Sequence, residues 1–203
     1  MSEKKARSLE KNLLEAVEIL KKGGIVAAAT ETFFGLMADI EGPRSIQKIR
    51  KIKGLDSAAP LLIIVPSLAE ARRLCETLSP RAEKLAKRYW PGPLTMILRA
   101  RMTVPPYLIG PYNTIALRIP GESDARELLR LYNKPLTATS CNLHGEPPAT
   151  TGRQVREAFK GKIDFIMPGT SPGGLPSTIV DITTPSPIIR RRGIVNVEGK
   201  YVR

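Results

Sequence analysis

The chain has 203 residues and a mass of 22.3 kDa, enough to bury a substantial core in one large α/β domain or two small ones. Its 32 Lys and Arg residues against 19 Asp and Glu residues give a net charge of +13, which favours anionic partners such as nucleotides, RNA or phosphorylated substrates. Two cysteines cannot build a disulfide framework or a four-ligand metal site. No apolar run approaches the roughly 20 residues of a membrane span. We therefore expect the protein in the cytoplasm or in a similarly reducing compartment.

The first third of the chain alternates helix and strand patterns. Ser8 can cap a helix that carries one apolar stripe and ends at Gly23 and Gly24, and this basic, amphipathic segment lacks the continuous apolar stretch of a secretory signal. A strand of small residues follows at 25–29, and isoleucines at helical spacing predict a helix over 44–53. The wholly apolar run at 60–66 is typical of a strand buried on both faces.

The remaining two thirds contain two further helices within 67–90, the second beginning at Ser79 and Pro80. Apolar runs then predict strands at 94–100, 114–120, 135–140, 163–167, 177–183 and 187–191, with helices at 122–132 and 150–159 between them. No internal repeat, low-complexity segment or long linker is present. We therefore predict one α/β domain over residues 1–203, with a twisted mixed sheet and flanking helices.

Polar residues cluster where the predicted strands end, which is where open α/β sheets bind ligands. Each signal is open to a second interpretation. A Ser or Thr at a strand end is commonly a turn or cap residue, and Arg118 within its apolar strand could belong to a site or extend to the surface. The run Arg190 to Arg192 is typical of a solvated edge with one member turned inward.

Several conventional sites are excluded or disfavoured by the motifs. The chain has no phosphate-binding G-x-x-x-x-G-K-[ST] and no dinucleotide-binding G-x-G-x-x-G after a strand. The only histidine, His144, lies three residues after Cys141, and the pair supplies at most two metal ligands. A catalytic Cys–His pair normally meets across a fold rather than along one tight loop, so we expect no covalent nucleophile here.

Seven motifs in order resemble those of the YrdC-like threonylcarbamoyl-AMP synthase family, between about Gly23 and Gly193. "GGIVAAATETFFGL" is similar to "G-G-x-V-A-[FY]-P-T-[DE]-T-V-Y-G-L", and "KGLDSAAPLLIIV" to "K-x-R-P-x-x-x-P-L". "WPGPLTMIL", "TIALRIP" and "ATSCNLHGEPP" resemble "W-P-G-P-x-T", "T-V-A-V-R-x-P" and "[ST]-S-A-N-x-S-G". "STIVDIT" and "IIRRRG" resemble the closing "S-T-[IV]-V-D" and "L-R-x-G".

The resemblance implies a YrdC-like fold around a basic, concave cleft. It also implies that L-threonine, bicarbonate and ATP, with Mg²⁺, give threonylcarbamoyl-AMP and pyrophosphate, and that partner proteins transfer the threonylcarbamoyl group to an adenosine of tRNA. Thr32 would help to hold threonine and Lys53 would face the ATP phosphates. The other cleft residues would be Thr114, Arg118, Ser140, Asn142, Ser177 and Arg191, with either arginine facing threonine.

This chemistry requires positioning and charge neutralisation rather than a covalent nucleophile. The amine of threonine captures CO₂ or bicarbonate, and the resulting carbamate oxygen attacks the α-phosphate. The protein must therefore hold several anionic groups together. Mg²⁺ would travel with the phosphates and keep most of its waters, so no dedicated protein cage is expected. Cys141 and His144 are then substitutions within a "TSANLSG"-like substrate loop.

Two departures from the family pattern remove positive or polar groups beside the expected triphosphate. Leu55 stands where the family has the Arg of "K-x-R", and Ala59 replaces a polar or basic residue. Each lost charge-assisted hydrogen bond is worth roughly 1.5–3 kcal/mol, unless Arg50, Lys51 or a C-terminal arginine compensates. The alternatives are therefore a non-catalytic RNA-binding paralogue, or an enzyme that transfers an adenylate or carbamoyl group to another small substrate. Because the chain stops soon after Gly193, we expect the short, single-domain type of the family.

Overall fold

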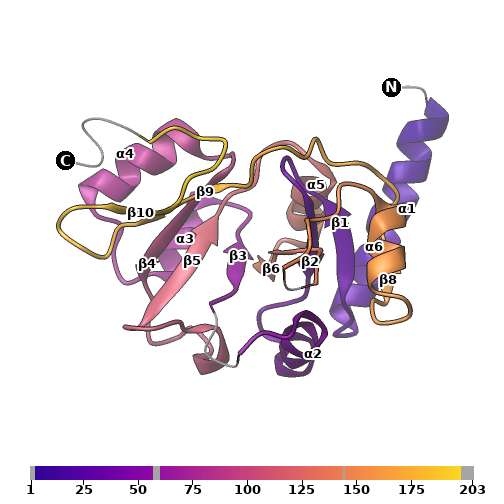
Figure 1. Ribbon diagram of the computed structural model, residues 1–203, viewed down its shortest axis with the longest axis horizontal. Helices are drawn as coiled ribbons and strands as arrows, with labels where there is room; N and C mark the ends of the chain where they lie inside the picture. Colours follow the sequence, from indigo (N-terminus) through magenta and orange to yellow (C-terminus); the bar gives the residue numbers. More distant parts are fainter. Residues whose placement is uncertain (1–2, 57–59, 144, 198–203) are drawn as a thin grey trace.

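The chain alternates helices with short strands, largely in the order that its hydrophobic pattern predicts (Figure 1). This computed structural model describes residues 3–56, 60–143 and 145–197. The helices are α1 (Glu3–Lys21), α2 (Pro43–Lys53), α3 (Leu68–Leu74), α4 (Pro80–Tyr89), the 3-10 helix η1 (Pro106–Leu108), α5 (Asp124–Tyr132) and α6 (Gly152–Ala158). The strands are β1 (Val26–Ala29), β2 (Phe34–Met37), β3 (Leu62–Ile64), β4 (Leu94–Arg99), β5 (Thr114–Arg118), β6 (Leu136–Thr137), β7 (Thr139–Ser140), β8 (Phe165–Ile166), β9 (Thr178–Asp181) and β10 (Ile188–Arg191).

Helix α1 begins at Glu3, so the predicted cap at Ser8 is wrong. The residues before Ser8 include Lys, Ala and Arg, which are good helix formers, and Glu3 in the first turn interacts favourably with the helix dipole. The predicted end is confirmed. The N–H groups of Gly23 and Gly24 donate to carbonyl oxygens of the last turn at 2.9 Å each, and Gly23 has a φ of 76°.

The strands form two mixed sheets rather than the single sheet that the sequence predicts. The small sheet has the order β7-β2-β1-β8, and the large sheet has the order β10-β9-β4-β5-β3-β6. Strand β1 pairs antiparallel with β2 and parallel with β8, and β5 pairs parallel with β3 and antiparallel with β4. The predicted α/β class is therefore confirmed. The second sheet depends on β2, which the sequence analysis missed because its four residues follow directly on a turn motif.

Residues 136–140 connect the two sheets. Strand β6 pairs with β3 in the large sheet, and β7 pairs with β2 in the small one. Between these pairings, the N–H of Ala138 donates to the Leu62 carbonyl and the N–H of Thr137 donates to the Ala38 carbonyl, both at 2.9 Å. One extended segment thus crosses from sheet to sheet and places Ser140 beside β2. The single domain over residues 1–203 stays a prediction.

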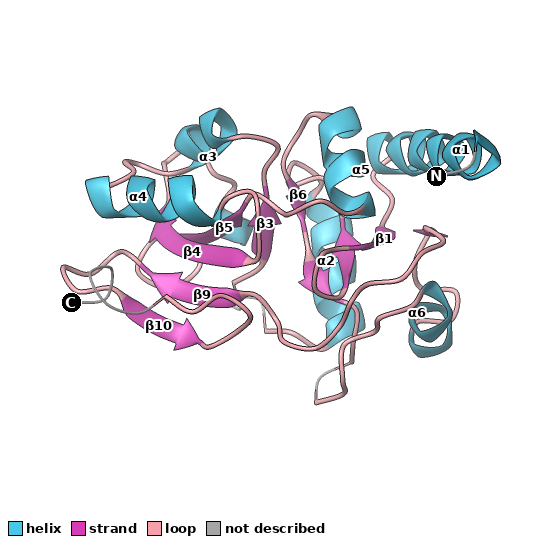
Figure 2. Cartoon of the chain, turned by 90° about the horizontal axis from the view of Figure 1, so that it is seen from above, coloured by secondary structure: helices cyan, strands magenta, loops and turns pink. Residues whose placement is uncertain are grey.

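The faces of the large sheet differ in a way that positions the site. Residues at alternate positions on one face, such as Met96, Leu98 and Leu117, are fully or almost fully buried in the main core with residues of α3 and α4. Figure 2 shows α3 and α4 together on one side of this sheet. Successive side chains of a strand point to opposite faces. The intervening residues, such as Ile97 and Ala116, therefore face away from these helices and are only partly buried.

Candidate substrate cleft between the two sheets

The open face of the large sheet forms one wall of a cavity of about 630 Å³. Its other wall comes from the turn between β1 and β2 and from residues 138–140 of the connecting segment. Six of the eight predicted site residues line it: Thr32, Thr114, Arg118, Ser140, Ser177 and Arg191. They come from five separate segments of the chain, and the crossing between the two sheets brings them together.

The cavity is basic, as the resemblance implies. Arg99, Arg118, Arg190 and Arg191 line it, and Asp181 is the acidic residue among its described lining. Arg190 is paired with Asp181 Oδ2 through Nη2 (2.7 Å) and Nε (3.1 Å), which partly neutralises its charge. Burial opposes ionisation of Asp181, but hydrogen bonds from Thr183 and Arg190 outweigh it and hold the pKa of this carboxyl below its ordinary value.

Arg191 binds the start of β9. Its Nη2 donates to Ser177 Oγ and to the Ser177 carbonyl, both at 3.0 Å, and its Nε donates to the same carbonyl at 3.1 Å. Ser177 Oγ in turn lies 3.0 Å from Thr95 Oγ1 on β4. Desolvation lowers the pKa of Arg191, and the nearby charge of Arg118 lowers it further. Two guanidinium groups therefore share one cleft wall, an arrangement suited to anionic groups of a ligand.

Arg118 ends β5 and is only 3% exposed, so it belongs to the cleft and does not extend to the surface. It forms an ion pair with Glu31, whose Oε1 also accepts a hydrogen bond from the Gly121 N–H at 2.7 Å. Glu31 stands in the turn between β1 and β2, next to Thr32. The pair therefore ties the small sheet to the large one at the cavity wall.

A hydroxyl-centred turn holds Thr32 in place. Thr30 Oγ1 accepts hydrogen bonds from the N–H groups of Thr32 (3.1 Å) and Phe33 (3.2 Å) and donates to the Phe33 carbonyl at 2.7 Å. Such side-chain to backbone bonds stabilise tight turns. Thr32 is buried in the wall, and its Oγ1 lies 3.1 Å from that of Thr30. Thr30 therefore both stabilises the turn and lines the cleft, two roles that the sequence analysis left as alternatives for a Thr at a strand end.

Lys53 and Asn142 are not among the residues that line the cavity, but they bind the loop that does. Lys53 follows Ile46 and Ile49 on the buried face of α2. Its ammonium donates to the carbonyl of Ser140, and at 2.9 Å to both the carbonyl and the side-chain oxygen of Asn142. The three protons of the ammonium therefore all bind the loop. Burial lowers the pKa of Lys53. Its contact with ATP phosphates stays a prediction.

The departures from the family pattern are only partly described by the structure. Leu55 packs against the main core and does not line the cavity. Arg50 does not replace the missing cation, because its guanidinium donates to the carbonyls of Asp56 (2.8 Å) and Tyr107 (2.9 Å). Ala59 and His144 lie outside the described residues. Compensation for the missing cation by the arginines on β10 stays a prediction.

The cavity-lining residues that the sequence analysis missed include Thr95, Arg99 and Asp181. Thr95 and Arg99 lie on the β4 face that also carries Ile97, so strand periodicity could have assigned them once Arg118 was placed on the same sheet. Asp181 belongs to the quoted "STIVD" motif, but its spacing to Ser177 became meaningful only with β9 in position.

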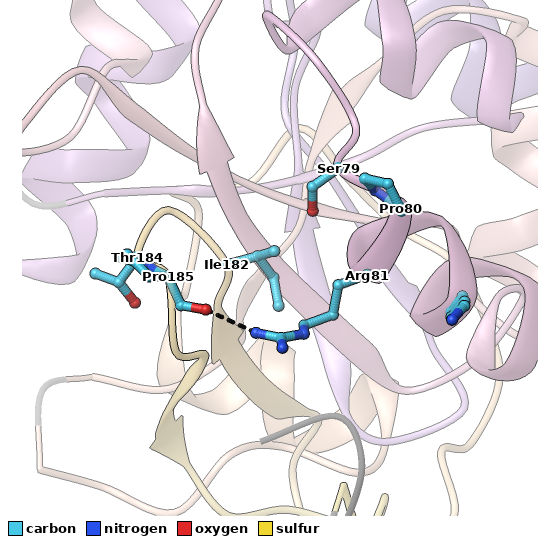
Figure 3. Close-up of a pocket in the computed structure, with 7 residues that line it drawn as sticks. Ser79, Pro80, Arg81, Ile182, Thr184 and Pro185 are labelled. Atoms are coloured by element: carbon cyan, nitrogen blue, oxygen red, sulfur yellow. Dashed lines mark hydrogen bonds between the residues drawn. The ribbon is translucent and has the colours of Figure 1, made fainter. Parts of the chain in front are cut away.

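A second cavity, of about 670 Å³, lies between the start of α4 and the loop after β9 and contains none of the predicted site residues. Figure 3 shows Arg81 reaching across it to the Pro185 carbonyl at 2.7 Å. Within the described part of the chain, no group of three or more His, Cys, Asp or Glu residues could hold a metal ion. Among the same residues, no helix is both long and apolar enough to cross a membrane.

Comparisons with known proteins agree with this geometry. Residues 18–193 match the model of the Sua5/YciO/YrdC family, which is described as "Telomere recombination". A threonylcarbamoyl-AMP synthase of Pyrococcus abyssi is 35% identical over 90% of this chain and 54% of its own length, and one of Nitrosococcus oceani is 35% identical over 82% and 90%. This chain thus spans about half the length of the first relative and most of the second.

Solved structures agree with the sequence relatives. P. abyssi Sua5 complexed with L-threonine has a TM-score of 0.85 and 35% identity, over 89% of this chain and 54% of that one. E. coli YciO has a TM-score of 0.86 and 27% identity, over 94% and 92%. With a family model that matches most of its length and these relatives, the chain belongs to the Sua5/YciO/YrdC family.

Proposed function

We propose that this protein is a threonylcarbamoyl-AMP synthase, which condenses L-threonine, bicarbonate and ATP to threonylcarbamoyl-AMP and pyrophosphate. The observation that carries the proposal is the gathering of Thr32, Arg118, Ser140, Ser177 and Arg191 around one basic cavity. Relatives with 35% identity are named for this activity, and a structure of one Sua5 protein was solved with L-threonine. We extend both to this chain as part of the proposal.

The cleft residues suit the chemistry of this reaction. The amine of threonine attacks CO₂ derived from bicarbonate, which forms the C–N bond of a carbamate and releases a proton. A carbamate oxygen then attacks the α-phosphorus of ATP, and pyrophosphate leaves. Arg118 and Arg191 neutralise anionic groups that would repel one another, and hydroxyls such as Thr32 and Ser140 orient the substrates. No step needs a covalent enzyme intermediate.

Mg²⁺ fits this site as a companion of ATP. Both oxygens of Asp181, the carboxylate in the cavity lining, already accept hydrogen bonds from Thr183 or Arg190. We therefore expect ATP phosphates and water to supply most of the ligands of the metal, as Mg²⁺ commonly allows. When bound, the ion would neutralise charge on the phosphates.

Threonine-dependent release of pyrophosphate tests the proposal. Purified protein with ATP, Mg²⁺ and bicarbonate should release pyrophosphate only when L-threonine is present. Arg118→Ala and Ser140→Ala should each lower the rate by roughly a hundredfold or more, because preorganised charge and hydrogen bonds dominate such catalysis.

Arg81→Ala is the matched control, since it removes an arginine from the other cavity (Figure 3) and should leave the rate unchanged. Wild-type rates in both cleft variants would refute the site assignment. No threonine-dependent release by the folded wild-type protein would refute the proposed activity.

The second candidate function is a non-catalytic RNA-binding protein with the same basic cleft. It is favoured by Leu55, which packs in the core where the family has an arginine, and by the engagement of Arg50 with backbone carbonyls. It predicts RNA binding that weakens steeply with salt and is not displaced by ATP. Displacement of bound RNA by ATP would argue against it.

The remaining partners and the domain organisation follow from the leading proposal. The product is a reactive mixed anhydride, so we expect tRNA and separate transfer proteins to consume it. The two sheets joined by residues 136–140 support a single domain over the chain. A test is transfer of labelled threonine to tRNA when the partner proteins are added.

A further inference from the structure

The ion pair between Glu31 and Arg118 is an unusual feature of the cleft wall, because it is buried and joins two sheets. The side chains of Arg118 and Glu31 are 4% and 14% exposed. The lack of a side chain at Gly121 leaves room for the Glu31 carboxylate, because a Cβ added there would lie 3.3 Å from Glu31 Oε1, closer than an ordinary contact. Its N–H also donates to Oε1 at 2.7 Å, so the carboxylate is fixed from two directions.

Part of the hydrogen-bonding capacity of this ion pair is unused. Arg118 Nε and Nη2 and Glu31 Oε2 are buried without a hydrogen-bond partner among the described residues, although Nη2 is in ion-pair contact with Glu31 Oε1. A buried ion pair that serves stability alone needs additional hydrogen bonds to repay its desolvation. Among the described residues this pair has one such bond, from the Gly121 N–H, and Arg118 lines the substrate cavity. The pair is therefore better explained by a role at the cavity than by stability alone.

The two cleft arginines differ in this respect. Arg191 makes three hydrogen bonds to Ser177, whereas among the described residues Arg118 is held by its ion pair with Glu31. Arg118 also lies beside the turn that carries Thr32, since Glu31 directly precedes Thr32 in the chain. A substrate carboxylate near Thr32 would therefore lie beside the guanidinium of Arg118, whereas that of Arg191 is engaged with the start of β9.

We infer that Glu31 is a positioning residue that holds the Arg118 guanidinium for the carboxylate of L-threonine. The inference rests on the proposed function. Glu31 acts in two ways. It sets the place of the guanidinium, and it offsets the repulsion between two arginines that are close enough for one to lower the pKa of the other. Without Glu31, the guanidinium of Arg118 loses its fixed orientation.

Calorimetric titration with L-threonine and, separately, with a non-hydrolysable ATP analogue tests this role. Glu31→Gln should weaken threonine binding by about tenfold, as expected for loss of a charge-assisted contact, and should change nucleotide binding by less than about twofold. Glu31→Asp should recover part of the threonine affinity. The control Glu122→Gln removes an exposed carboxylate paired with Arg126 and Arg130, and should bind threonine like the wild type.

A double-mutant cycle separates positioning from general stability. In an Arg118→Lys background, Glu31→Gln should add little further loss of threonine affinity, because the residue through which it acts has changed. Equal weakening of threonine and nucleotide binding, additive effects in the cycle, or wild-type threonine affinity in Glu31→Gln would overturn the inference. Each of these three results would leave the proposed function unaffected, provided that the wild-type protein binds threonine. A wild type that binds no threonine would remove both.

Discussion

At the scale of single residues, Cys141 illustrates how burial decides chemistry. The spacing of Cys141 and His144 suggested a metal half-site or a nucleophile with its base. Cys141 is 1% exposed within the main core, and this burial raises the pKa of its thiol far above the ordinary value, although the charge of Lys53 acts in the opposite direction. A thiol in such surroundings is not a nucleophile near neutral pH. The sequence analysis interpreted Cys141 as a substitution within a substrate loop, and its place in the core is a finding of the structure.

We predict that neither cysteine of the native protein reacts readily with a thiol reagent at about pH 8, where an exposed thiol is substantially ionised. Cys75 is also buried, and burial raises its pKa as well. Titration with Ellman's reagent should give no fast reaction for the folded protein and two equivalents after denaturation. Fast labelling of Cys141 in the folded state would instead return it to the list of candidate nucleophiles.

At the scale of elements, the β9–β10 hairpin delivers Asp181, Arg190 and Arg191 to the cleft, and it depends on one close backbone approach. A Cβ at Gly193 would lie 2.1 Å from the Pro176 carbonyl oxygen and 2.5 Å from the Ser177 carbonyl carbon. These are backbone atoms, so they cannot move aside without shifting the start of β9. Gly193 therefore fixes Ser177 beside Arg191, and the "L-R-x-G" motif has a physical reason at its last position.

Gly193→Ala should lower the free energy of unfolding by about 1–3 kcal/mol, the usual cost of overpacking, and should also lower the rate of threonine-dependent pyrophosphate release. Chemical denaturation and the pyrophosphate assay measure the two effects. Gly161→Ala is the control, because Gly161 has a φ of 68° but nothing within 4 Å of an added Cβ. It should cost only about 1–2 kcal/mol of left-handed strain and leave the rate unchanged. Wild-type stability and rate in Gly193→Ala would show that the hairpin tolerates a shift.

At the scale of the whole molecule, the net charge of +13 and the four arginines in the cavity lining create a field that attracts anions. ATP carries several negative charges, whereas threonine is a zwitterion with no net charge. The two proposed substrates should therefore respond differently to ionic strength.

The KM for ATP should rise several-fold as NaCl is raised from about 0.05 to about 0.5 M, because exposed charges are increasingly screened over this range. The KM for threonine should change by less than about twofold, since Arg118 and Glu31 are buried and close-range pairs are screened less. Steady-state rates of pyrophosphate release at a series of salt concentrations measure both. An equal rise for the two substrates would indicate that salt acts on the protein as a whole.

Much of the fold was predictable because local patterns agree with it. The helices α2, α4 and α5 follow apolar spacing and end signals in the sequence, and Ser79 caps α4 with its hydroxyl as expected. The errors were at the start of α1 and at β2. Good helix formers before Ser8 extended α1, and a four-residue strand directly after a turn has too little periodicity to recognise.

By itself, the sequence determined the α/β class, the basic character of the protein, the order of its elements and the segments that carry cleft residues. These depend on composition, local periodicity and motif order, which are properties of neighbouring residues. Only the tertiary structure decided that residues 136–140 link two sheets, that Lys53 binds the Ser140 loop, and that Glu31 pairs with Arg118. Lys53 and Ser140 are 87 positions apart, and so are Glu31 and Arg118, because strand pairing across the two sheets brings their chain segments together. Such contacts leave no periodic signal in the chain.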